Sequence, residues 1–306
     1  MDIFNPSVYD FINKYIPEQN IYLRESMKNH TTFRVGGEAA YLLRPVDEEG
    51  LREVISFFKE ENIPFFVKGN GSNILVGDNG YYGAIIEISH TMNEIKVDSD
   101  IIKTGAGALM SAISSEALKH SLTGMEFASG IPGTIGGGVT MNAGAYGGEL
   151  KDIVTAVRVL DAEGNAYTLS NEDMKFGYRT SILKSGQYVV TEVTIRLNSG
   201  DAETIRASME DLNTRRREKQ PLEYPSAGST FKRPEGYFAG KLIEDAGLRG
   251  FTIGGAQVSE KHCGFVINKK DATAKDIRTL IEHIQRTVSE KEGVLLEPEV
   301  IFLGDF

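Results

Sequence analysis

Hydrophobic and polar residues alternate with helical periodicity in the segment between residues 47 and 62. Its apolar positions recur every three or four residues, at Leu51, Val54, Ile55 and Phe58. This spacing places them on one face of an amphipathic helix. Asp47 stands where a helix begins, and its carboxylate is suited to accept hydrogen bonds from the first turn. The pattern predicts a helix with one buried face.

Short apolar runs follow and predict strands joined by a glycine-containing turn. In PFFVKGNGSNILV, residues 64–76, two apolar runs flank Gly69, Asn70, Gly71, Ser72 and Asn73. Another strand is predicted at GAIIEIS, residues 83–89. The run from residue 100 to residue 122 then indicates a strand, a tight glycine turn and a helix.

Strands dominate the middle of the chain and helices return in the last third. Strands are predicted at residues 153–160, 166–169 and 188–197, with the hairpin sequence DAEGN between the first two. A polar helix from Asp201 to Lys219 marks a domain change, so we place a boundary near Gly200. Further helices are expected at residues 238–246 and along an apolar stripe from Ile277 to Val288, and strands at residues 264–268 and 295–304. The elements predict an α+β fold that is not a simple doubly wound sheet.

Composition narrows the class of protein. Of the 306 residues, 41% are hydrophobic and 25% are charged, which is typical of a globular chain with a large core. We find no signal peptide and no apolar run long enough to span a membrane. Cys263 is the only cysteine, which fits a reducing compartment, and we expect it to be a small buried residue.

Histidine spacing argues against a metal site, and net charge argues against a nucleic-acid-binding protein. The five histidines include no pair at metal-ligand spacing on one helix, so no metal site is expected. The net charge of −10 opposes nonspecific binding to nucleic acid, although a local cationic site can still hold a small anion.

Two glycine-rich segments are the strongest candidates for chemistry. The turn GNGSN at residues 69–73 can bring backbone N–H groups close to phosphate oxygens, but it is neither a dinucleotide fingerprint nor a P-loop, and an ordinary turn is the alternative. The second segment, GIPGTIGGGVTMNAGAYGGEL at residues 130–150, holds eight glycines in 21 positions. Interspersed Ile131, Ile135, Val139 and Met141 indicate a packed segment, so a flat ligand lying against the glycines is plausible. Together the segments suggest a dinucleotide cofactor.

Six motifs carry a resemblance to a known family. They are FRVGG at 33–37, GNGSNILV at 69–76, GIPGTIGGGVTMNAGAYG at 130–147, GYRTS at 177–181, PSAGSTFKRP at 225–234 and LEPEV at 296–300. In this order they resemble UDP-N-acetylenolpyruvoylglucosamine reductases. The resemblance spans residues 33–300, and six motifs in order are far more specific than any one alone.

The resemblance implies a fold and an activity. It implies an FAD enzyme that uses NADPH to reduce UDP-N-acetylglucosamine enolpyruvate to UDP-N-acetylmuramate in peptidoglycan synthesis. It implies a two-part FAD-binding region of the vanillyl-alcohol-oxidase-like type, at residues 1–86 and 87–199, and a smaller α+β substrate domain at 200–296. Residues 297–306 would return as a strand to the first part. We expect a cytoplasmic monomer of the family's second, shorter type, because GYRTSIL leads directly into a strand.

The family's catalytic residues match three positions in this chain. Arg179 in GYRTS matches the arginine that stabilises charge on the substrate carboxylate. Ser229 in SAGST matches the serine that protonates the carbon next to the carboxylate after hydride reaches the vinyl carbon. Glu299 in EPEV matches the catalytic glutamate, whose protonation state stays open. Glu297 would share a strand face with Glu299, so the choice between them rests on the motif.

The resemblance also implies residues that contact the two ligands. FAD contacts are expected at Gly69, Asn70, Gly71, Ser72, Asn73, Gly130, Ile131, Pro132, Gly133, Thr134, Gly137, Gly138, Ala143 and Gly144. Substrate contacts are expected at Tyr178, Lys219, Lys232, Arg233 and His262, although His262 could equally be a core histidine. Consecutive residues of a helix point about 100° apart, so Arg215, Arg216 and Arg217 are expected to form mostly a solvated helix end.

Two other functions stay open on the sequence alone. One is another flavoprotein oxidoreductase of the same FAD-binding superfamily, such as an oxidase. The other is a flavin- or nucleotide-binding protein without turnover, which would not need Arg179, Ser229 and Glu299 together.

Overall fold

A computed structural model describes residues 3–306, and the chain forms two compact units. Of the described residues, the first contains 3–23, 40–70 and 83–216, and the second contains 24–39, 71–82 and 217–306. Each unit has its own buried hydrophobic core. The division into residues 1–86, 87–199 and 200–296 stays a prediction.

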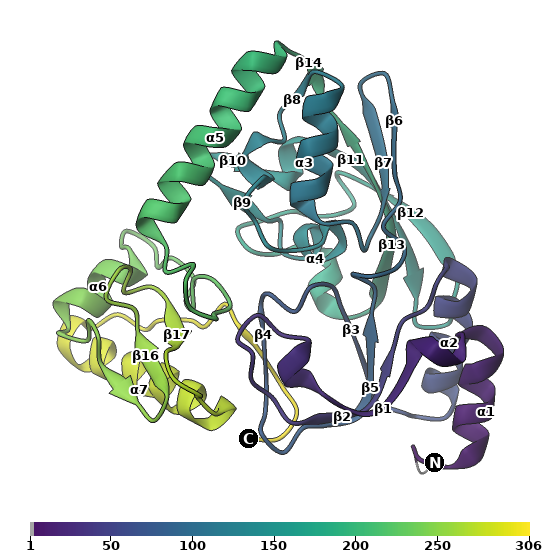
Figure 1. Ribbon diagram of the computed structural model, residues 1–306, viewed down its shortest axis with the longest axis horizontal. Helices are drawn as coiled ribbons and strands as arrows, with labels where there is room; N and C mark the ends of the chain where they lie inside the picture. Colours follow the sequence, from purple (N-terminus) through teal and green to yellow (C-terminus); the bar gives the residue numbers. More distant parts are fainter. Residues whose placement is uncertain (1–2) are drawn as a thin grey trace. The chain divides into compact units, whose positions relative to one another are not determined.

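The N-terminal part contains two helices and a four-stranded sheet (Figure 1). Helix α1 (Pro6–Tyr15) packs against α2 (Glu48–Glu60), and the Asp47 carboxylate caps α2 by accepting from the Gly50 N–H at 2.8 Å, which confirms the predicted helix start. The sheet has the order β1 (Ile21–Ser26), β2 (Glu38–Leu43), β5 (Tyr81–Glu87) and β3 (Phe65–Lys68). Strands β3 and β5 are parallel, with Lys68 opposite Glu87.

A five-stranded antiparallel sheet forms most of the rest of the first unit. Its order is β12 (Ala166–Ser170), β11 (Val154–Asp161), β13 (Tyr188–Arg196), β7 (Ile101–Gly105) and β6 (Ile95–Asp98). The β11–β12 pairing confirms the predicted hairpin, whose turn contains Gly164 at φ +83°. Such a backbone angle is easily adopted only by glycine.

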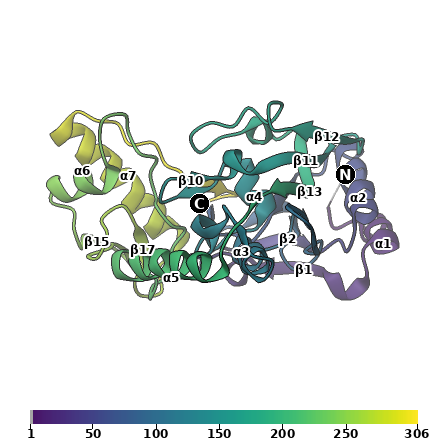
Figure 2. The ribbon, with the colours of Figure 1, turned by 90° about the horizontal axis from the view of Figure 1, so that it is seen from above.

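Two helices pack on this sheet. Helix α3 (Met110–Lys119) contacts β6. The short α4 (Ile135–Thr140) contacts β13, beside which it is labelled in Figure 2. Two-residue pairings join β8 (Leu122–Thr123) to β14 (Asn198–Ser199) and β9 (Gly144–Ala145) to β10 (Gly148–Glu149). Short 3-10 turns occupy Glu18–Asn20, Met27–Asn29, Glu126–Ala128, Leu150–Asp152 and Ile182–Ser185.

The second unit holds a small sheet covered by helices. Strands β15 (Thr252–Ile253), β16 (Ala256–Val258) and β17 (Val266–Asn268) pair antiparallel. Helix α7 (Ala274–Glu292) contacts all three strands, and α6 (Ala239–Asp245) contacts α7. The predicted stripe of α7 is buried, as is Cys263. Helix α5 (Ala202–Lys219) extends from the first unit into residues of the second.

The C-terminal strand is shorter than predicted. Strand β18 (Ile301–Leu303) pairs parallel with β4 (Ile74–Val76), while residues 295–300 are not a strand. Pro298 makes only an isolated bridge to Phe231. The Lys232 N–H donates to the Glu297 carbonyl at 2.9 Å and the Glu299 N–H donates to the Thr230 carbonyl at 2.8 Å, so Glu297 and Glu299 flank this bridge. That their side chains share one face stays a prediction.

Candidate functional site

The two glycine-rich segments meet inside the first unit. Asn70 Nδ2 donates a hydrogen bond to the Pro132 carbonyl at 2.7 Å. A Cβ atom placed on Gly69 would overlap Thr134 Oγ1, so only glycine allows the two segments to approach so closely. The structure thus brings together predicted contacts that lie more than 60 residues apart in the sequence.

The second segment is packed, as expected, and contains the short helix α4, which the sequence analysis did not predict. Thr134 caps the helix by accepting from the Gly137 N–H at 3.4 Å. A Cβ on Gly138 would lie 2.8 Å from Leu150 Cδ1 and 2.9 Å from Met110 Sδ. A side chain at residue 138 would therefore force Leu150 or Met110 to shift, which favours glycine here in spite of its poor helix propensity.

Gly137 differs from its neighbours because its Cα faces open space. A Cβ there would meet only Thr134 Oγ1, at 3.6 Å, and the residue is exposed. At Gly144, by contrast, a Cβ would lie 2.7 Å from the Gly148 carbonyl oxygen across the β9–β10 pairing. Among the glycines predicted to contact the cofactor, Gly137 best fits an approach by a ligand.

The GYRTS loop packs on this glycine segment. Asn142 Nδ2 donates to the Gly177 carbonyl at 3.1 Å, and Ser181 Oγ donates to the Thr140 carbonyl at 2.8 Å. Arg179 has φ +54°, a left-handed conformation that non-glycine residues seldom adopt. Its Nη2 donates to the Gly144 carbonyl at 3.3 Å. The loop therefore holds Arg179 against the glycine segment in a strained backbone conformation.

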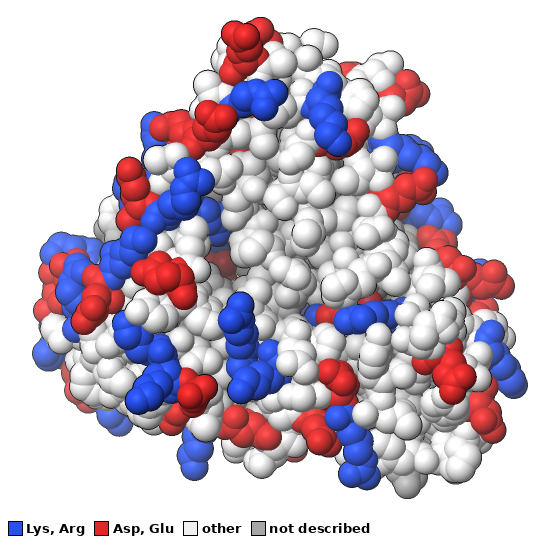
Figure 3. Space-filling model, viewed as in Figure 1, with Lys and Arg blue, Asp and Glu red and all other residues white. Residues whose placement is uncertain are grey.

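The surroundings of Arg179 are polar and aromatic. Its guanidinium carbon lies 5.7 Å from the centre of the Tyr178 ring, and Tyr178 itself is exposed. The pKa of Glu149 is lowered, first by the hydrogen bond from Lys151 and also by the positive charge of Arg179. Figure 3 shows a broad area without charged side chains over α4 and β9.

The remaining residues of the first turn belong to the second unit. The Gly71 carbonyl accepts from the Thr32 N–H at 3.2 Å, and a Cβ on Gly71 would overlap the His30 carbonyl. Asn73 Nδ2 donates to the Glu299 carbonyl at 3.1 Å, and the Asn73 carbonyl accepts from the Ile301 N–H at 3.0 Å. These bonds connect the turn to the C-terminal strand.

Ser229 and Glu299 lie near one anchored residue of the second unit. Thr230 is fully buried, and its carbonyl accepts from the Glu299 N–H at 2.8 Å. Thr230 Oγ1 accepts from the Val266 N–H at 2.9 Å, which fixes the segment to β17. Ser229 is exposed next to this anchor, and Gly228 before it has φ +76°. A rigid main chain therefore presents the Ser229 hydroxyl to solvent.

The predicted cations have different surroundings. Lys232 forms an ion pair with Glu297, whose carboxylate offsets its charge. The Arg233 guanidinium lies 4.0 Å from the centre of the Phe238 ring, and its Nε donates to the Tyr237 carbonyl at 3.2 Å. Lys219 is exposed at the end of α5. Of the three cations, Lys219 is the one for which we observe no ion pair with a carboxylate within residues 3–306.

His262 is half-buried and held by the main chain. Its Nδ1 accepts from the Gly264 N–H at 3.1 Å, and its ring meets Phe265 edge-on at 5.0 Å between centroids. Burial lowers the pKa of His262, which favours the neutral imidazole. The geometry agrees with a structural histidine, and the substrate contact of His262 stays a prediction.

Sequence reasoning missed Arg216. Its side chain is half-buried and packs against Gly130. The packing is close, since a Cβ atom placed on Gly130 would lie only 3.0 Å from Arg216 Cδ. Burial lowers the pKa of Arg216, and Tyr146 acts in the opposite direction. Arg215 instead pairs with Asp211 at 2.8 Å. Arg215 and Arg217 are exposed, so the expectation of a mostly solvated helix end is confirmed, and Arg216 is the half-buried exception within it.

Within residues 3–306, no group of three His, Cys, Asp or Glu side chains could hold a metal ion. In the same part of the chain, no helix is both long and apolar enough to cross a membrane.

Comparisons with known proteins assign both halves of the chain. Residues 39–170 match the FAD binding domain family, and residues 220–303 match the family "UDP-N-acetylenolpyruvoylglucosamine reductase, C-terminal domain". The first match contains the two glycine-rich segments, and the second contains Ser229 and Glu299.

Relatives match almost the whole chain. The UDP-N-acetylenolpyruvoylglucosamine reductase of Caldanaerobacter subterraneus subsp. tengcongensis is 52% identical over 97% of this chain and 98% of its own length. That of Clostridioides difficile is 51% identical over 98% and 99%, respectively. The crystal structure of UDP-N-acetylenolpyruvylglucosamine reductase from Thermus caldophilus aligns with a TM-score of 0.78 at 34% identity, covering 92% of this chain and 98% of that one.

A more distant structure shares the fold alone. Wild-type Phl p 4.0202, a glucose dehydrogenase, aligns with a TM-score of 0.50 at 15% identity over 63% of this chain and 44% of that one. The α+β fold and the FAD-binding domain expected from the sequence are thereby confirmed.

Proposed function

The chain belongs to the UDP-N-acetylenolpyruvoylglucosamine reductase family, and from this membership we propose that it reduces UDP-N-acetylglucosamine enolpyruvate to UDP-N-acetylmuramate. The cofactor is FAD, and the reductant that we propose is NADPH. In the balanced reaction, a hydride adds to the vinyl carbon, a proton adds to the carbon beside the carboxylate, and NADPH becomes NADP⁺. The observation that carries the proposal is that the FAD binding domain family and the reductase C-terminal domain family match successive parts of this chain. Within the first of these parts, the two glycine-rich segments contact each other.

The residues of the first unit fit an FAD group. Gly69 and Asn70 are fixed against the 132–134 segment, and the exposed Gly137 leaves space beside it. Ser129 Oγ, just before the second segment, is buried without a hydrogen-bond partner among the described residues. Such an atom is costly unless a ligand or water satisfies it. We assign FAD to these residues, and when bound FAD supplies the two-electron chemistry between NADPH and the substrate.

Arg179 is assigned to the substrate carboxylate. Negative charge grows on that group as the vinyl carbon receives hydride, and a guanidinium that is always protonated stabilises it without a proton transfer. The strained loop and the bond to the Gly144 carbonyl support a pre-positioned side chain. Preorganised charge is more effective than charge that must reorient during the reaction.

Ser229 is assigned to proton delivery. Its hydroxyl would protonate the carbon beside the carboxylate, because a carbanionic carbon is basic enough to accept a proton from a weak acid. The exposed position next to the anchored Thr230 supports this role. Glu299, joined to the same anchor through its N–H, is assigned to the return of a proton to Ser229.

Cations are assigned to the phosphates of the substrate and NADPH. Lys219 and Arg233 are retained, with Tyr178 and His262 as further substrate contacts. Lys232 is retained with a smaller expected contribution, because Glu297 already offsets its charge. We add Arg216, since a half-buried guanidinium beside a glycine segment favours an anionic partner.

Assembly, location and family type complete the proposal. We propose a monomer in the cytoplasm, where the single buried Cys263 needs no oxidising environment. Only Gly186 and Gln187 separate the turn Ile182–Ser185 from β13, which leaves no room for the additional tyrosine-bearing loop of the first family type. This spacing supports the second, shorter type.

Anaerobic visible spectroscopy of Ser229→Ala tests the assignment. We expect the yellow flavin colour to bleach with NADPH as in the wild type, because the cofactor residues are unchanged. Adding the enolpyruvyl sugar nucleotide should return the colour in the wild type and leave Ser229→Ala bleached, with turnover reduced at least 100-fold.

The matched control is Ser226→Ala, three residues earlier in the same segment. It should behave as the wild type in both half-reactions. Near-normal turnover of Ser229→Ala would remove the proton-donor assignment. A wild-type protein that binds FAD and bleaches but never regains colour with the substrate would instead remove the reductase assignment.

A further inference from the structure

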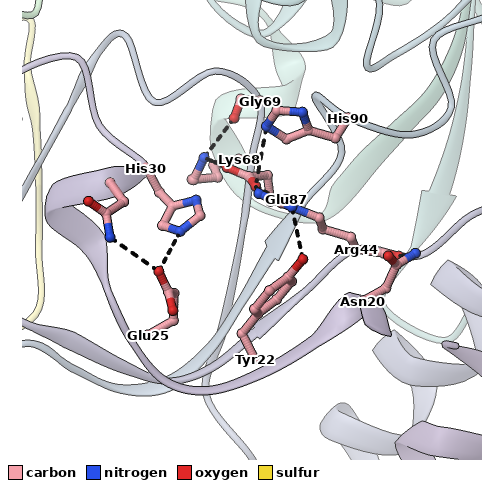
Figure 4. Close-up of polar contacts among 10 residues, drawn as sticks. Asn20, Tyr22, Glu25, His30, Arg44, Lys68, Gly69, Glu87 and His90 are labelled. Carbon is pink, nitrogen blue, oxygen red and sulfur yellow. Dashed lines mark hydrogen bonds and ion pairs between the residues drawn. The ribbon is translucent and has the colours of Figure 1, made fainter. Parts of the chain in front are cut away.

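A buried charge cluster lies directly beneath the first glycine turn in the first unit. Lys68 ends β3 and Glu87 ends β5, and the two residues face each other as an ion pair (Figure 4). Each side chain is only 2% exposed. Arg44 donates to the same carboxylate through Nε and Nη2, both at 2.7 Å. Tyr22 in turn accepts from Arg44 Nη1 at 3.1 Å.

Stability alone does not explain why Lys68 is present. A buried ion pair can often be replaced by apolar side chains without loss of stability, because removing two charges from water is costly. Arg44 already balances the charge of Glu87. Burial lowers the pKa of Lys68, and Glu87 acts in the opposite direction. Lys68 is therefore a second, costly cation beside one carboxylate, which leads us to ask what its ammonium group contacts.

Besides Glu87, the ammonium contacts the main chain of the turn. Lys68 Nζ donates to the Gly69 carbonyl at 2.9 Å. In a trans peptide the C=O and N–H groups point in opposite directions, and the chain has no cis peptide among its described residues. With the Gly69 oxygen turned toward Lys68, the Asn70 N–H must point away from the cluster.

The side chain of Asn70 fixes the same peptide from the other end. Asn70 Nδ2 is bonded to the Pro132 carbonyl, so the Gly69–Asn70 peptide is held between Lys68 and the second glycine segment. Backbone N–H groups that are held outward at such turns bind phosphate oxygens. Preorganisation of this kind strengthens binding because less motion is lost when the ligand arrives.

We propose that Lys68 is a positioning residue for the pyrophosphate of FAD, acting through the Gly69 carbonyl to aim the Asn70 N–H at a phosphate oxygen. This inference rests on the proposed function. Glu87 keeps the ammonium in place, and Arg44 keeps Glu87 in place. Lys68 itself contacts neither the cofactor nor the substrate.

Lys68→Met tests the inference in the apoprotein. Methionine fills a similar volume, and Arg44 still balances Glu87, so folding should be retained. We expect FAD to bind about tenfold more weakly, as measured by fluorescence titration, because one positioned donor is lost. In the FAD-saturated protein, the ³¹P NMR signals of the pyrophosphate should shift relative to the wild type, a change that a general loss of stability would not produce.

Two further variants make the result decisive. In Lys68→Met/Glu87→Gln, the amide oxygen still accepts from Arg44 and no buried carboxylate needs a cation, yet FAD should bind as weakly as in Lys68→Met. In the control Arg158→Met, the bidentate pair with Glu48 at 2.8 Å is lost from the same unit. This control should lower the melting temperature but leave FAD affinity within about twofold and the ³¹P signals unchanged.

Each outcome has a distinct meaning. Wild-type affinity and wild-type ³¹P signals in both Lys68 variants would overturn the positioning role while leaving the proposed function intact. Equal loss of affinity in Arg158→Met would also overturn it, because the effect would then follow stability. A wild-type apoprotein that binds no FAD would overturn both the inference and the proposed function.

Discussion

At the scale of single residues, the glycines of the candidate site serve two different purposes. Gly69 is closed off by Thr134 of the same unit, whereas Gly137 faces open space. The first is required by the protein's own packing, and the second leaves room for a ligand. Sequence alone treats the two identically, so alanine substitutions at both positions separate packing from binding.

Gly69→Ala should destabilise the apoprotein by about 1–3 kcal/mol, because the added methyl group overlaps Thr134 Oγ1. Gly137→Ala should leave the apoprotein as stable or slightly more stable, since alanine favours α4, and should weaken FAD binding. Urea unfolding and FAD titration of both variants check this. The distinction is lost if Gly137→Ala binds FAD as tightly as the wild type does.

At the scale of elements, helix α7 is held at its start by a residue from far along the chain. Thr273 and Asp276 form a capping box, and the Asp78 carboxylate accepts from the Ala274 N–H at 2.8 Å and the Lys275 N–H at 2.9 Å. These donors have no partner within the helix, and a negative charge at the N-terminus also favours the helix dipole.

Asp78→Ala should therefore lower the free energy of unfolding by about 1–3 kcal/mol, because two N–H groups lose their acceptor. Asp78→Asn keeps one side-chain oxygen and should lose clearly less. Hydrogen exchange of the first turn of α7 and urea midpoints would measure both. Equal loss of stability in Asp78→Ala and Asp78→Asn would contradict this expectation, because the oxygen that asparagine keeps would then contribute nothing.

At the scale of the whole molecule, the second unit is assembled from three separate parts of the chain. Phe33, Val35 and Leu75 pack in the same core as the helices after residue 217, and β18 pairs with β4. A C-terminal fragment consequently lacks part of its own core, although a family model matches residues 220–303 as a region.

A fragment of residues 217–306 should remain largely unfolded in isolation, because β18 loses its partner and the core loses three large apolar side chains. Circular dichroism and the dispersion of amide NMR signals would test this against the full chain. A cooperatively unfolding fragment with native-like NMR dispersion would contradict the expectation.

Much of the architecture could be predicted from local patterns. The spacing of Leu51, Val54, Ile55 and Phe58 identified α2, and Asp47 identified its start. The DAEGN hairpin was likewise predicted correctly. Local patterns failed where distant contacts decide the conformation, as at α4, where Met110 and Leu150 exclude side chains from Gly138. They failed at residues 295–300, where the structure has only an isolated bridge between Phe231 and Pro298.

The sequence by itself determined the periodic helices and strands, the order of the motifs and, through that order, the family. These features depend on residues that are close together in the chain or on the identity of the residues in each motif. Only the tertiary structure decided that Lys68 lies beneath the Gly69 peptide, that Arg216 is half-buried and that Asp78 caps α7. The spacing of residues along the chain does not reveal which partner a charged side chain will have, because burial and pairing arise only when distant segments pack together.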